Sequence, residues 1–416
     1  MRKIELHWKI LIAIVLAVLF GLYFSNYIDY VSWMGDIFIR SLKMIVAPLI
    51  LTSIASGVAN IGSAGNLGKL GLKTMTYYMV TSVFAITTGL LMVNMMKPGV
   101  GANLGLVQEV EGLSGSANSF LDIIINIIPE NIFAAFVNNQ MLSIIFFALL
   151  IGFFISKLGE KNKTFLLSTV NSGFELMMKI TTFIIKFTPY GVFGIVASTV
   201  ADQAGDSEAL VEISKRLGLY MLTVIFALII HSMIILPLIL KYFGKINPLT
   251  HVKAMSIPLL TAFSTSSSSA TLPLTMEAIE KKAGVSNKVT SFVLPLGATI
   301  NMDGTALYEC IAAMFIAQAY GVELGAVEQI IVVVTSLLAS IGAAGIPMAG
   351  LVMISVVLTA VGLPLEGIGL ILAVDRILDM FRTAVNVWSD SCGALLIAKT
   401  EGETLNYSEK KKEKNG

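Results

Sequence analysis

The sequence predicts an all-α polytopic membrane protein, on two observations. Hydrophobic residues make up 56% of its 416 residues and charged residues only 13%, whereas about a quarter of a soluble domain is charged. The apolar residues also gather into long stretches suited to a hydrocarbon core, which a helix of ~20 residues crosses. The clearest stretches cover 10–24, 44–58, 77–96, 141–155 and 217–240. A single soluble core could not bury so much apolar surface, so the chain is expected to lie in a bilayer.

Both ends of the chain are basic, which sets the expected orientation. Arg2 and Lys3 precede the first apolar run, and lysines crowd the tail over 409–414. No small-residue cleavage site ends the first run, so it is expected to stay as a span rather than to be removed as a signal peptide. The positive-inside rule then places both termini in the cytoplasm. The net charge of +1 gives no basic domain, so nucleic acid is not an expected partner.

The first half of the chain is expected to be helical, with helices near 8–27, 36–60, 70–97, 119–158, 164–203 and 209–242. The fourth is expected in pieces, with breaks near Pro129 and Asn138. Pro189, together with Gly191, is expected to bend the fifth. The polar, Gly-rich stretch over 97–119 is expected to be an exposed loop.

Two short, interrupted apolar segments distinguish the second half. Within 257–274, the consecutive serines and threonines from Ser264 to Ser269 could not face lipid in a simple span. Residues 339–347 are a second run of small residues, ended by Pro347. The flanking apolar arms are each about 15 residues long, or ~22 Å of helix, too short for a ~30 Å core. Both segments are therefore predicted to be re-entrant helical hairpins with tips inside the protein.

Each predicted hairpin precedes a helix with polar groups, so one layout occurs twice. Residues 297–305 follow the first hairpin, and residues 375–390 follow the second. Short, Gly/Pro-interrupted segments at matching places in two repeats point to the binding site of a transporter. The alternative is that two Gly-rich kinks match by chance.

The strongest functional signal is a polar side of the last predicted helix, formed by Asp375, Asp379, Arg382, Thr383, Asn386 and Asp390. Their spacing places them within an arc of about 100°. A charge at mid-membrane costs about 2.5–3.5 kcal/mol on insertion scales, so the charges of this helix must face a polar interior. The alternative is an internal ion-pair network without a ligand.

The residue types on this helix indicate what the ligand is. Arg382 offers a planar fork of donors that suits a carboxylate, and Asp379, one turn earlier, suits an ammonium group. Backbone amides at the hairpin tips can bind a second carboxylate. Two carboxylate positions and one ammonium position together describe an acidic α-amino acid.

Cation coupling has its own candidates. Asp303 and Asp390 are carboxylates expected beside unwound backbone, and hard cations prefer such oxygen ligands. Tyr78, Thr81 and Ser82 share a face of the third predicted helix and could complete a site, although a polar contact between helices explains these three equally.

Glu309 is a candidate proton carrier. It stands alone in an apolar stretch, where burial disfavours a charged carboxyl group. The alternative is a structural, hydrogen-bonded carboxyl.

These motifs resemble the glutamate/aspartate transporter family, the dicarboxylate/amino acid:cation symporters of the excitatory amino acid transporter type. The resemblance covers nearly the whole chain and rests on 266–273 (SSSSATLP), 301–305 (NMDGT), the 342–350 tip and the pattern from Asp379 to Asn386. It implies a homotrimer in the cell membrane, with eight transmembrane helices and two re-entrant hairpins per subunit, inverted repeats and an elevator mechanism. The implied cargo is L-aspartate or L-glutamate with sodium ions, and no organic cofactor.

The resemblance also implies a division of the chain. Scaffold helices would lie in 1–69 and 119–205. A transport domain would comprise 70–118, with the third helix and the following loop, and the core over 206–400. Residues 401–416 would form a cytoplasmic tail.

Carried over to this sequence, the resemblance assigns the substrate site. Arg382 would grip the side-chain carboxylate of the substrate and Asp379 its amino group. The site would be completed by Ser267, Ser268, Thr305, Ile346, Gly350, Thr383 and Asn386.

The resemblance implies three sodium sites. The first would be formed by Asn386, Asp390 and the backbone of Gly297 and Asn301. The second would use the backbone of Thr299, Ser340, Ile341 and Ala343, near Met302. The third would be formed by Tyr78, Thr81, Ser82, Asn301 and Asp303.

Two departures from the family pattern leave the ion stoichiometry open. Ser266 and Met380 stand where family members usually carry a further arginine. Tyr308-Glu309 matches the animal branch, in which that glutamate is linked to proton coupling. The alternatives are a proton-coupled carrier of acidic amino acids or dicarboxylates and an ion channel whose buried charges line a pore. An enzyme is not expected, because the sequence offers no recognisable nucleophile–base pair or metal cluster.

Overall fold

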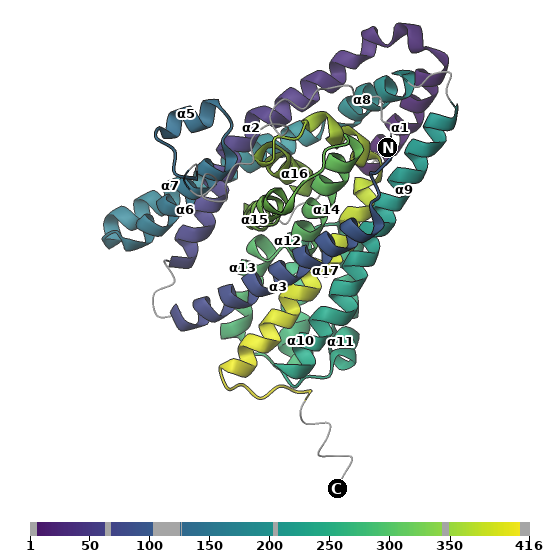
Figure 1. Ribbon diagram of the computed structural model, residues 1–416. Helices are drawn as coiled ribbons and strands as arrows, with labels where there is room; N and C mark the ends of the chain where they lie inside the picture. Colours follow the sequence, from purple (N-terminus) through teal and green to yellow (C-terminus); the bar gives the residue numbers. More distant parts are fainter. Residues whose placement is uncertain are drawn as a thin grey trace, which may run out of the picture.

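The computed structural model describes residues 6–62, 68–102, 125, 127–202, 207–342 and 349–407, and the regular elements within these ranges are helices (Figure 1). Those of the first half are α1 (Leu6–Tyr23), α2 (Asp29–Gly62), α3 (Gly68–Met96), α5 (Ile132–Val137), α6 (Met141–Lys157), α7 (Glu160–Ile185) and α8 (Thr188–Asp202). Those of the second half are α9 (Ser207–Ile230), α10 (Leu236–Tyr242), α11 (Pro248–Thr265), α12 (Ser268–Ala278), α13 (Asn287–Ile300), α14 (Asp303–Ala319), α15 (Ala326–Gly342), α16 (Ala349–Ala360) and α17 (Ile368–Thr400).

The first-half helices follow the sequence prediction except at three ends, one of which is the start of the fifth helix, at Glu160 rather than near 164. The first helix ends at Tyr23, followed by a 3-10 turn, and the second begins at Asp29 rather than near 36. The expected start was wrong because Asp29 lies in the first turn of α2, where a carboxylate favours the positive end of the helix dipole. The predicted break near Asn138 is confirmed between α5 and α6. Residues 103–124, which hold much of the expected loop, lie outside the described part.

The predicted bend of the fifth helix is confirmed. The axes of α7 and α8 differ by 52°, and the break falls just before Pro189, which cannot donate a backbone hydrogen bond. A second irregularity, a π-helical segment over His231–Ile235, separates α9 from α10. Pro237 lies at the start of α10, and the wider π turn accommodates the ring and the lost N–H of this proline.

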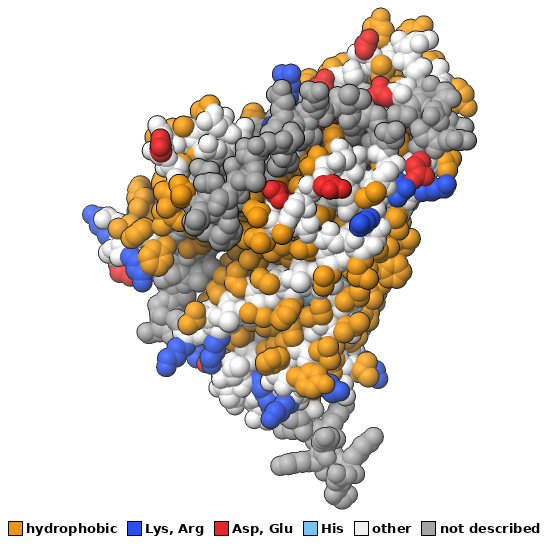
Figure 2. All heavy atoms as spheres, in the orientation of Figure 1, with side chains coloured by type: hydrophobic (Ala, Val, Ile, Leu, Met, Phe, Trp, Pro, Cys, Tyr) orange, Lys and Arg blue, Asp and Glu red, His pale blue; other side chains and the backbone are white. Residues whose placement is uncertain are grey.

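Much of the protein surface is apolar. In the described residues, three helices are long and apolar enough to span a membrane, namely Asp29–Asn60, Lys69–Met96 and Val211–Tyr242, and the bent α7–α8 pair could form a fourth. Figure 2 shows hydrophobic side chains across the middle of one face, with lysine and arginine side chains along its lower edge. Such a surface suits lipid rather than water. The total of eight transmembrane helices stays a prediction.

Both predicted hairpins are pairs of consecutive helices that pack against each other, α11 with α12 and α15 with α16. The first tip falls inside the Ser/Thr run, as predicted. Ser266 ends α11 in the left-handed conformation, with φ of 51°. Ser267 then caps α12, accepting a hydrogen bond from the Ala270 N–H at 3.2 Å. The second tip, 343–348, lies outside the described residues.

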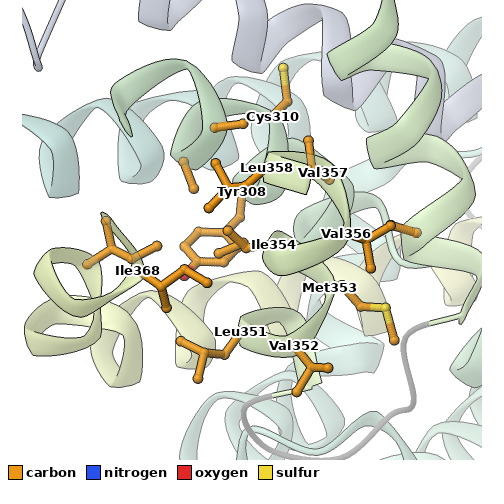
Figure 3. Packing of buried hydrophobic residues seen from close by; sticks show 14 of the residues in the cluster. Tyr308, Cys310, Leu351, Val352, Met353, Ile354, Val356, Val357, Leu358 and Ile368 are labelled. Carbon is orange, nitrogen blue, oxygen red and sulfur yellow. The ribbon is translucent and has the colours of Figure 1, made fainter. Parts of the chain in front are cut away.

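Helix α14 lies at the centre of the second half. It packs against α3, α9, α15, α16 and α17, and every residue of α14 except Gln318 is buried. Figure 3 shows the Tyr308 ring among Ile354, Leu358 and Ile368, which belong to α16 and α17. This apolar packing fixes α14 against α17, and α3 and α17 run side by side across the molecule (Figure 1).

The first residues of the predicted tail, 401–407, are packed on the protein and form what we name the C-terminal clasp. Its contacts reach three other elements. Lys73 Nζ of α3 lies 2.6 Å from Glu401 Oε1, and the Asn406 N–H donates to the Ala283 carbonyl at 2.9 Å. The Tyr407 hydroxyl lies 3.4 Å from His251 Nδ1 of α11. The clasp therefore joins α3, the first hairpin and the end of α17.

Candidate substrate and cation site

The predicted polar side of α17 faces the protein interior. Its six residues, Asp375, Asp379, Arg382, Thr383, Asn386 and Asp390, are all buried, and the Arg382 side chain is 1% exposed. The sequence prediction that these charges avoid lipid is confirmed. Arg382 forms ion pairs with Asp375 and Asp379 inside the protein, which lowers the cost of burying their charges, whereas Asp390 accepts a hydrogen bond from the neutral Asn301 amide.

Arg382 lies between two carboxylates and an aromatic ring. Its Nε donates to Asp379 Oδ1 at 2.9 Å, and its Nη1 lies 3.2 Å from Asp375 Oδ1. The guanidinium carbon is 4.1 Å from the centre of the Tyr308 ring, and the Tyr308 hydroxyl donates to Asp375 Oδ1 at 2.5 Å. Tyr308 and Asp375, which the sequence did not assign to the substrate site, therefore hold the arginine in place.

The two terminal nitrogens of Arg382, Nη1 and Nη2, have N–H donors that could still form hydrogen bonds. Both are buried, and neither makes a hydrogen bond to any described residue, although carboxylates lie within ion-pair distance. Buried polar groups without partners are rare and call for an explanation. A carboxylate ligand would supply the missing acceptors in the bidentate geometry that a guanidinium favours.

Several other predicted substrate residues surround this arginine. A β-carbon at Gly350 would lie 2.8 Å from Arg382 Nη1, so the start of α16 touches the guanidinium. Thr305 accepts a hydrogen bond from Asn386 Nδ2 at 3.1 Å. Phe263 of α11 packs edge-on against Phe381, with ring centres 5.1 Å apart, which brings the first hairpin next to α17.

Three further predicted substrate residues are buried. Ser267 and Ser268 are buried at the first tip, and Thr383 is buried next to Arg382. The predicted residue Ile346 lies outside the described residues, so its position is not assigned.

The first predicted cation site is partly assembled. Asn301 Nδ2 donates to Asp390 Oδ1 at 2.8 Å, and a β-carbon at Gly297 would lie 2.5 Å from the same oxygen. The third member of this predicted site, Asn386, contacts the start of α14 instead: its Oδ1 accepts a hydrogen bond from the Gly304 N–H at 2.7 Å. Asn301 is not helical, as predicted, since it lies in the break between α13 and α14. In this break the Met302 carbonyl accepts from the Ala306 N–H at 2.8 Å, which leaves the Asn301 carbonyl as the candidate backbone ligand.

Most residues of the third predicted cation site lie together around Asp303. Asp303 Oδ1 accepts from Ser82 at 2.7 Å and from Thr81 at 3.3 Å, and Thr81 also lies 3.4 Å from Asn301 Oδ1. All four side chains are fully buried. Tyr78 lies on the same face of α3, but its hydroxyl donates to the Val293 carbonyl at 2.7 Å. Several oxygen atoms thus converge in a dry interior, which suits a hard cation.

The second predicted cation site is described only in part. Ser340 is buried, with its hydroxyl bonded to the Leu337 carbonyl at 2.8 Å, and Ile341 is half-buried beside it. Met302 is buried, with its sulfur 3.3 Å from Asn386 Nδ2. The Thr299 side chain is exposed, so only the backbone of this residue could face an ion. Ala343 lies outside the described residues.

Two residues that contact Asp303 were also missed by the sequence analysis. Ser389 donates to Asp303 Oδ2 at 2.6 Å, and His231 Nε2 lies 3.1 Å from the same oxygen. Ser389 follows Asn386 by three positions, so its helical spacing could have revealed it. His231 reaches Asp303 from the π-helical segment, whose position is not readable from periodicity.

Glu309 is fully buried, and neither of its carboxyl oxygens has a hydrogen-bond partner among the described residues. The hydrogen-bonded structural role considered from the sequence does not match this geometry. A buried carboxyl without partners is costly as an anion and stable as a neutral acid.

Residues 6–400 match the family described as the sodium:dicarboxylate symporter family. The chain is 37% identical over 421 residues to the proton/sodium-glutamate symport protein of Geobacillus stearothermophilus, covering 99% of this chain and 97% of that protein. It is 36% identical over 416 residues to the proton/glutamate-aspartate symporter of Escherichia coli, covering 96% and 93%. It is 36% identical over 437 residues to human excitatory amino acid transporter 3, covering 93% and 82%.

Proposed function

The chain belongs to the sodium:dicarboxylate symporter family, and from that premise we propose that it is a secondary active symporter of acidic amino acids, L-aspartate or L-glutamate, driven by sodium. The observation that carries this proposal is Arg382, a buried guanidinium whose two terminal nitrogens make no hydrogen bond to any described residue and lie beside buried carboxylates. The names of relatives across bacteria and animals, which specify glutamate or aspartate symport, support the same substrate class.

The substrate would bind through charge pairing at both ends. Its side-chain carboxylate would meet Nη1 and Nη2 of Arg382, and its ammonium group would meet Asp379. Asp375 stays as the counter-ion of Arg382, held by the Tyr308 hydroxyl at 2.5 Å. A neutral amino acid would leave Nη1 and Nη2 without the hydrogen-bond acceptors that the substrate carboxylate would supply, which costs about 1–3 kcal/mol. This difference would select acidic substrates.

Sodium would bind close to the substrate, at Asp303 and at Asp390. Two uncompensated carboxylates inside a membrane protein are unfavourable, and a monovalent cation at each would offset the charge. Asn386 contacts Thr305 of the substrate site and also the backbone of Gly304, next to Asp303. Sodium at the carboxylates would therefore fix the backbone that presents the substrate residues, which is a physical basis for coupling.

The proposal includes a movement of one part of the protein against another. α3 and α9 to α17, with residues 70–118 and 206–400, would form the transport domain. α1, α2 and α5 to α8 would form a scaffold in a homotrimer. Eight transmembrane helices, two re-entrant hairpins and cytoplasmic termini complete this arrangement. The second hairpin, whose residue Gly350 touches Arg382, would act as the gate.

Uptake by purified protein in liposomes tests this function. An inward sodium gradient should accumulate radiolabelled L-aspartate above the external concentration, and a potassium gradient of equal size should not. An ion channel, the alternative from another class, would pass current without aspartate and would accumulate none. Absence of accumulation together with substrate-independent current would overturn the proposal.

A further inference from the structure

The two oxygens of the Asp303 carboxylate have different surroundings. Oδ1 faces Thr81 and Ser82 of α3, which belong to the predicted cation site. Oδ2 is turned away from them, toward Ser389 of α17 and His231 of the π-helical segment. Ser389 and His231 thus hold one oxygen of the carboxylate, and the other oxygen faces the hydroxyls of Thr81 and Ser82.

Ser389 connects this carboxylate to the second buried aspartate. Its hydroxyl donates to Asp303 Oδ2 at 2.6 Å and accepts a hydrogen bond from Asn301 Nδ2 at 3.0 Å. The same amide nitrogen of Asn301 donates to Asp390 Oδ1 at 2.8 Å. A continuous chain of hydrogen bonds therefore runs from Asp390 to Asp303 through Asn301 and Ser389. All four residues are buried.

His231 is the second residue that contacts Oδ2 of Asp303. A carboxylate oxygen only accepts, so the proton of this imidazole is on Nε2, which lies 3.1 Å from Asp303 Oδ2. The other nitrogen, Nδ1, is buried and has no partner among the described residues. The next residue, Ser232, accepts a hydrogen bond from Trp388 Nε1 at 3.1 Å. The π-helical segment is thereby tied to α17 directly beside Ser389.

We propose that Ser389 and His231 are positioning residues for the sodium site at Asp303, and that Ser389 also links this site to the one at Asp390. The inference rests on the proposed function. Groups behind a metal ligand fix its orientation, and their loss typically costs 10–100-fold in metal affinity. With Oδ2 occupied by two donors, Oδ1 stays directed at the hydroxyls of α3. Loss of Ser389 would remove one of the two donors that hold Oδ2 and would break the hydrogen-bonded link between Asp303 and Asn301.

The test measures sodium binding rather than transport. The purified full chain in detergent would be titrated with sodium at fixed L-aspartate, and binding followed by calorimetry or tryptophan fluorescence. Ser389→Ala should raise the half-saturating sodium concentration about tenfold and lower the steepness of the sodium dependence. At saturating sodium, its affinity for L-aspartate should match that of the unmodified protein. Ser389→Thr, which keeps the hydroxyl, should restore most of the sodium affinity.

A matched control lies two residues further along the same helix. Ser391 is also fully buried, but its hydroxyl donates to the Trp388 carbonyl at 2.7 Å and lies 3.0 Å from His251 Nε2. Ser391→Ala should leave the sodium dependence unchanged. His231→Leu should raise the half-saturating sodium concentration, and His231→Gln, whose amide nitrogen can replace Nε2–H, should raise it less.

Asp303→Asn separates failure of the inference from failure of the proposed function. If Asp303→Asn removes the sodium dependence while Ser389→Ala and His231→Leu keep it unchanged, the positioning roles are wrong and the proposed cation site stands. If Asp303→Asn itself retains the normal sodium dependence, the cation site at Asp303 is wrong, and the inference falls with it. If Ser389→Ala fails to fold, the two His231 variants provide the test. A larger rise in the half-saturating sodium concentration in His231→Leu than in His231→Gln supports the inference, and no rise in either variant contradicts it.

Discussion

Gly350 lies directly against the guanidinium of Arg382: a β-carbon at this glycine would be 2.8 Å from Nη1 and 3.0 Å from Cζ. The arginine has little room to yield, because Asp375, Asp379 and the Tyr308 ring hold it. The second hairpin therefore meets the proposed substrate arginine through a residue without a side chain.

Gly350→Ala is expected to lower the affinity for L-aspartate at saturating sodium by tenfold or more, equal to ~1.4 kcal/mol. The added methyl group would displace either the guanidinium or the start of α16. Calorimetric binding of L-aspartate measures the effect. Gly218→Ala is the control, because no atom of the described residues lies within 4 Å of a β-carbon at that position of α9. Equal affinities in the two variants would contradict the close contact.

Arg382→Ala is expected to abolish L-aspartate uptake while the oligomer stays intact, because the carboxylate of the substrate loses its only proposed cationic partner. Arg382→Lys keeps the charge but loses the fork of donors and the contact with the Tyr308 ring. It should therefore retain weak binding at best. Uptake in liposomes and the particle mass in detergent are the measurements. Normal uptake by Arg382→Ala would remove the basis of the site assignment.

Glu309→Gln is expected to leave sodium-dependent L-aspartate binding in place and to remove the pH dependence of uptake. The glutamine is close in size and neutral, so it mimics the protonated acid, which costs less than the anion in a buried position where no described residue bonds to the carboxyl oxygens. Uptake should be measured between pH 5.5 and pH 8.5 for both proteins. A pH profile that is unchanged in the variant would show that protons, if coupled, move elsewhere.

The C-terminal clasp is expected to loosen in acid. The hydrogen bond from Lys73 lowers the pKa of the Glu401 carboxyl below its usual value of 4.5. A lowered pKa in the folded state means that this contact contributes fully above pH 4.5 and is lost as the pH falls below it. A spin label at the exposed position Thr404 should become more mobile as the pH is lowered through this range.

Lys73→Gln provides the control for the clasp. Without the lysine the label should already be mobile at pH 6 and should respond less to acid. Equal mobility in the two proteins at pH 6 would show that the contact between Lys73 and Glu401 does not hold the clasp.

The parts of the fold that could be predicted from the sequence are those that depend on the exclusion of polar groups from lipid. The serine and threonine run of the first hairpin was expected to be buried, and this holds for its middle, Ser266 to Ser268, where α11 ends and α12 begins, whereas Ser264 and Ser269 are exposed. The charges of α17 had to share one buried side, and their spacing identified Asp379, Arg382 and their neighbours.

The parts that could not be predicted depend on contacts between distant segments. His231 reaches Asp303 only because a π-helical segment precedes Pro237. The clasp depends on Gly284, which has φ of +79° and leaves room for Asn406, 2.6 Å from where a β-carbon would lie. The exposed side chain of Thr299 follows from the orientation of α13 against its neighbours, and periodicity alone does not fix that orientation.

The measurement that tests the central claim most directly is L-aspartate binding to the purified protein at several sodium concentrations, with a pH series alongside. Sodium-coupled symport predicts that the affinity for L-aspartate rises steeply with sodium, because the cations at Asp303 and Asp390 fix the backbone beside Arg382. Equal affinity with and without sodium would contradict it and would make protons, carried by Glu309, the leading candidate for the driving ion.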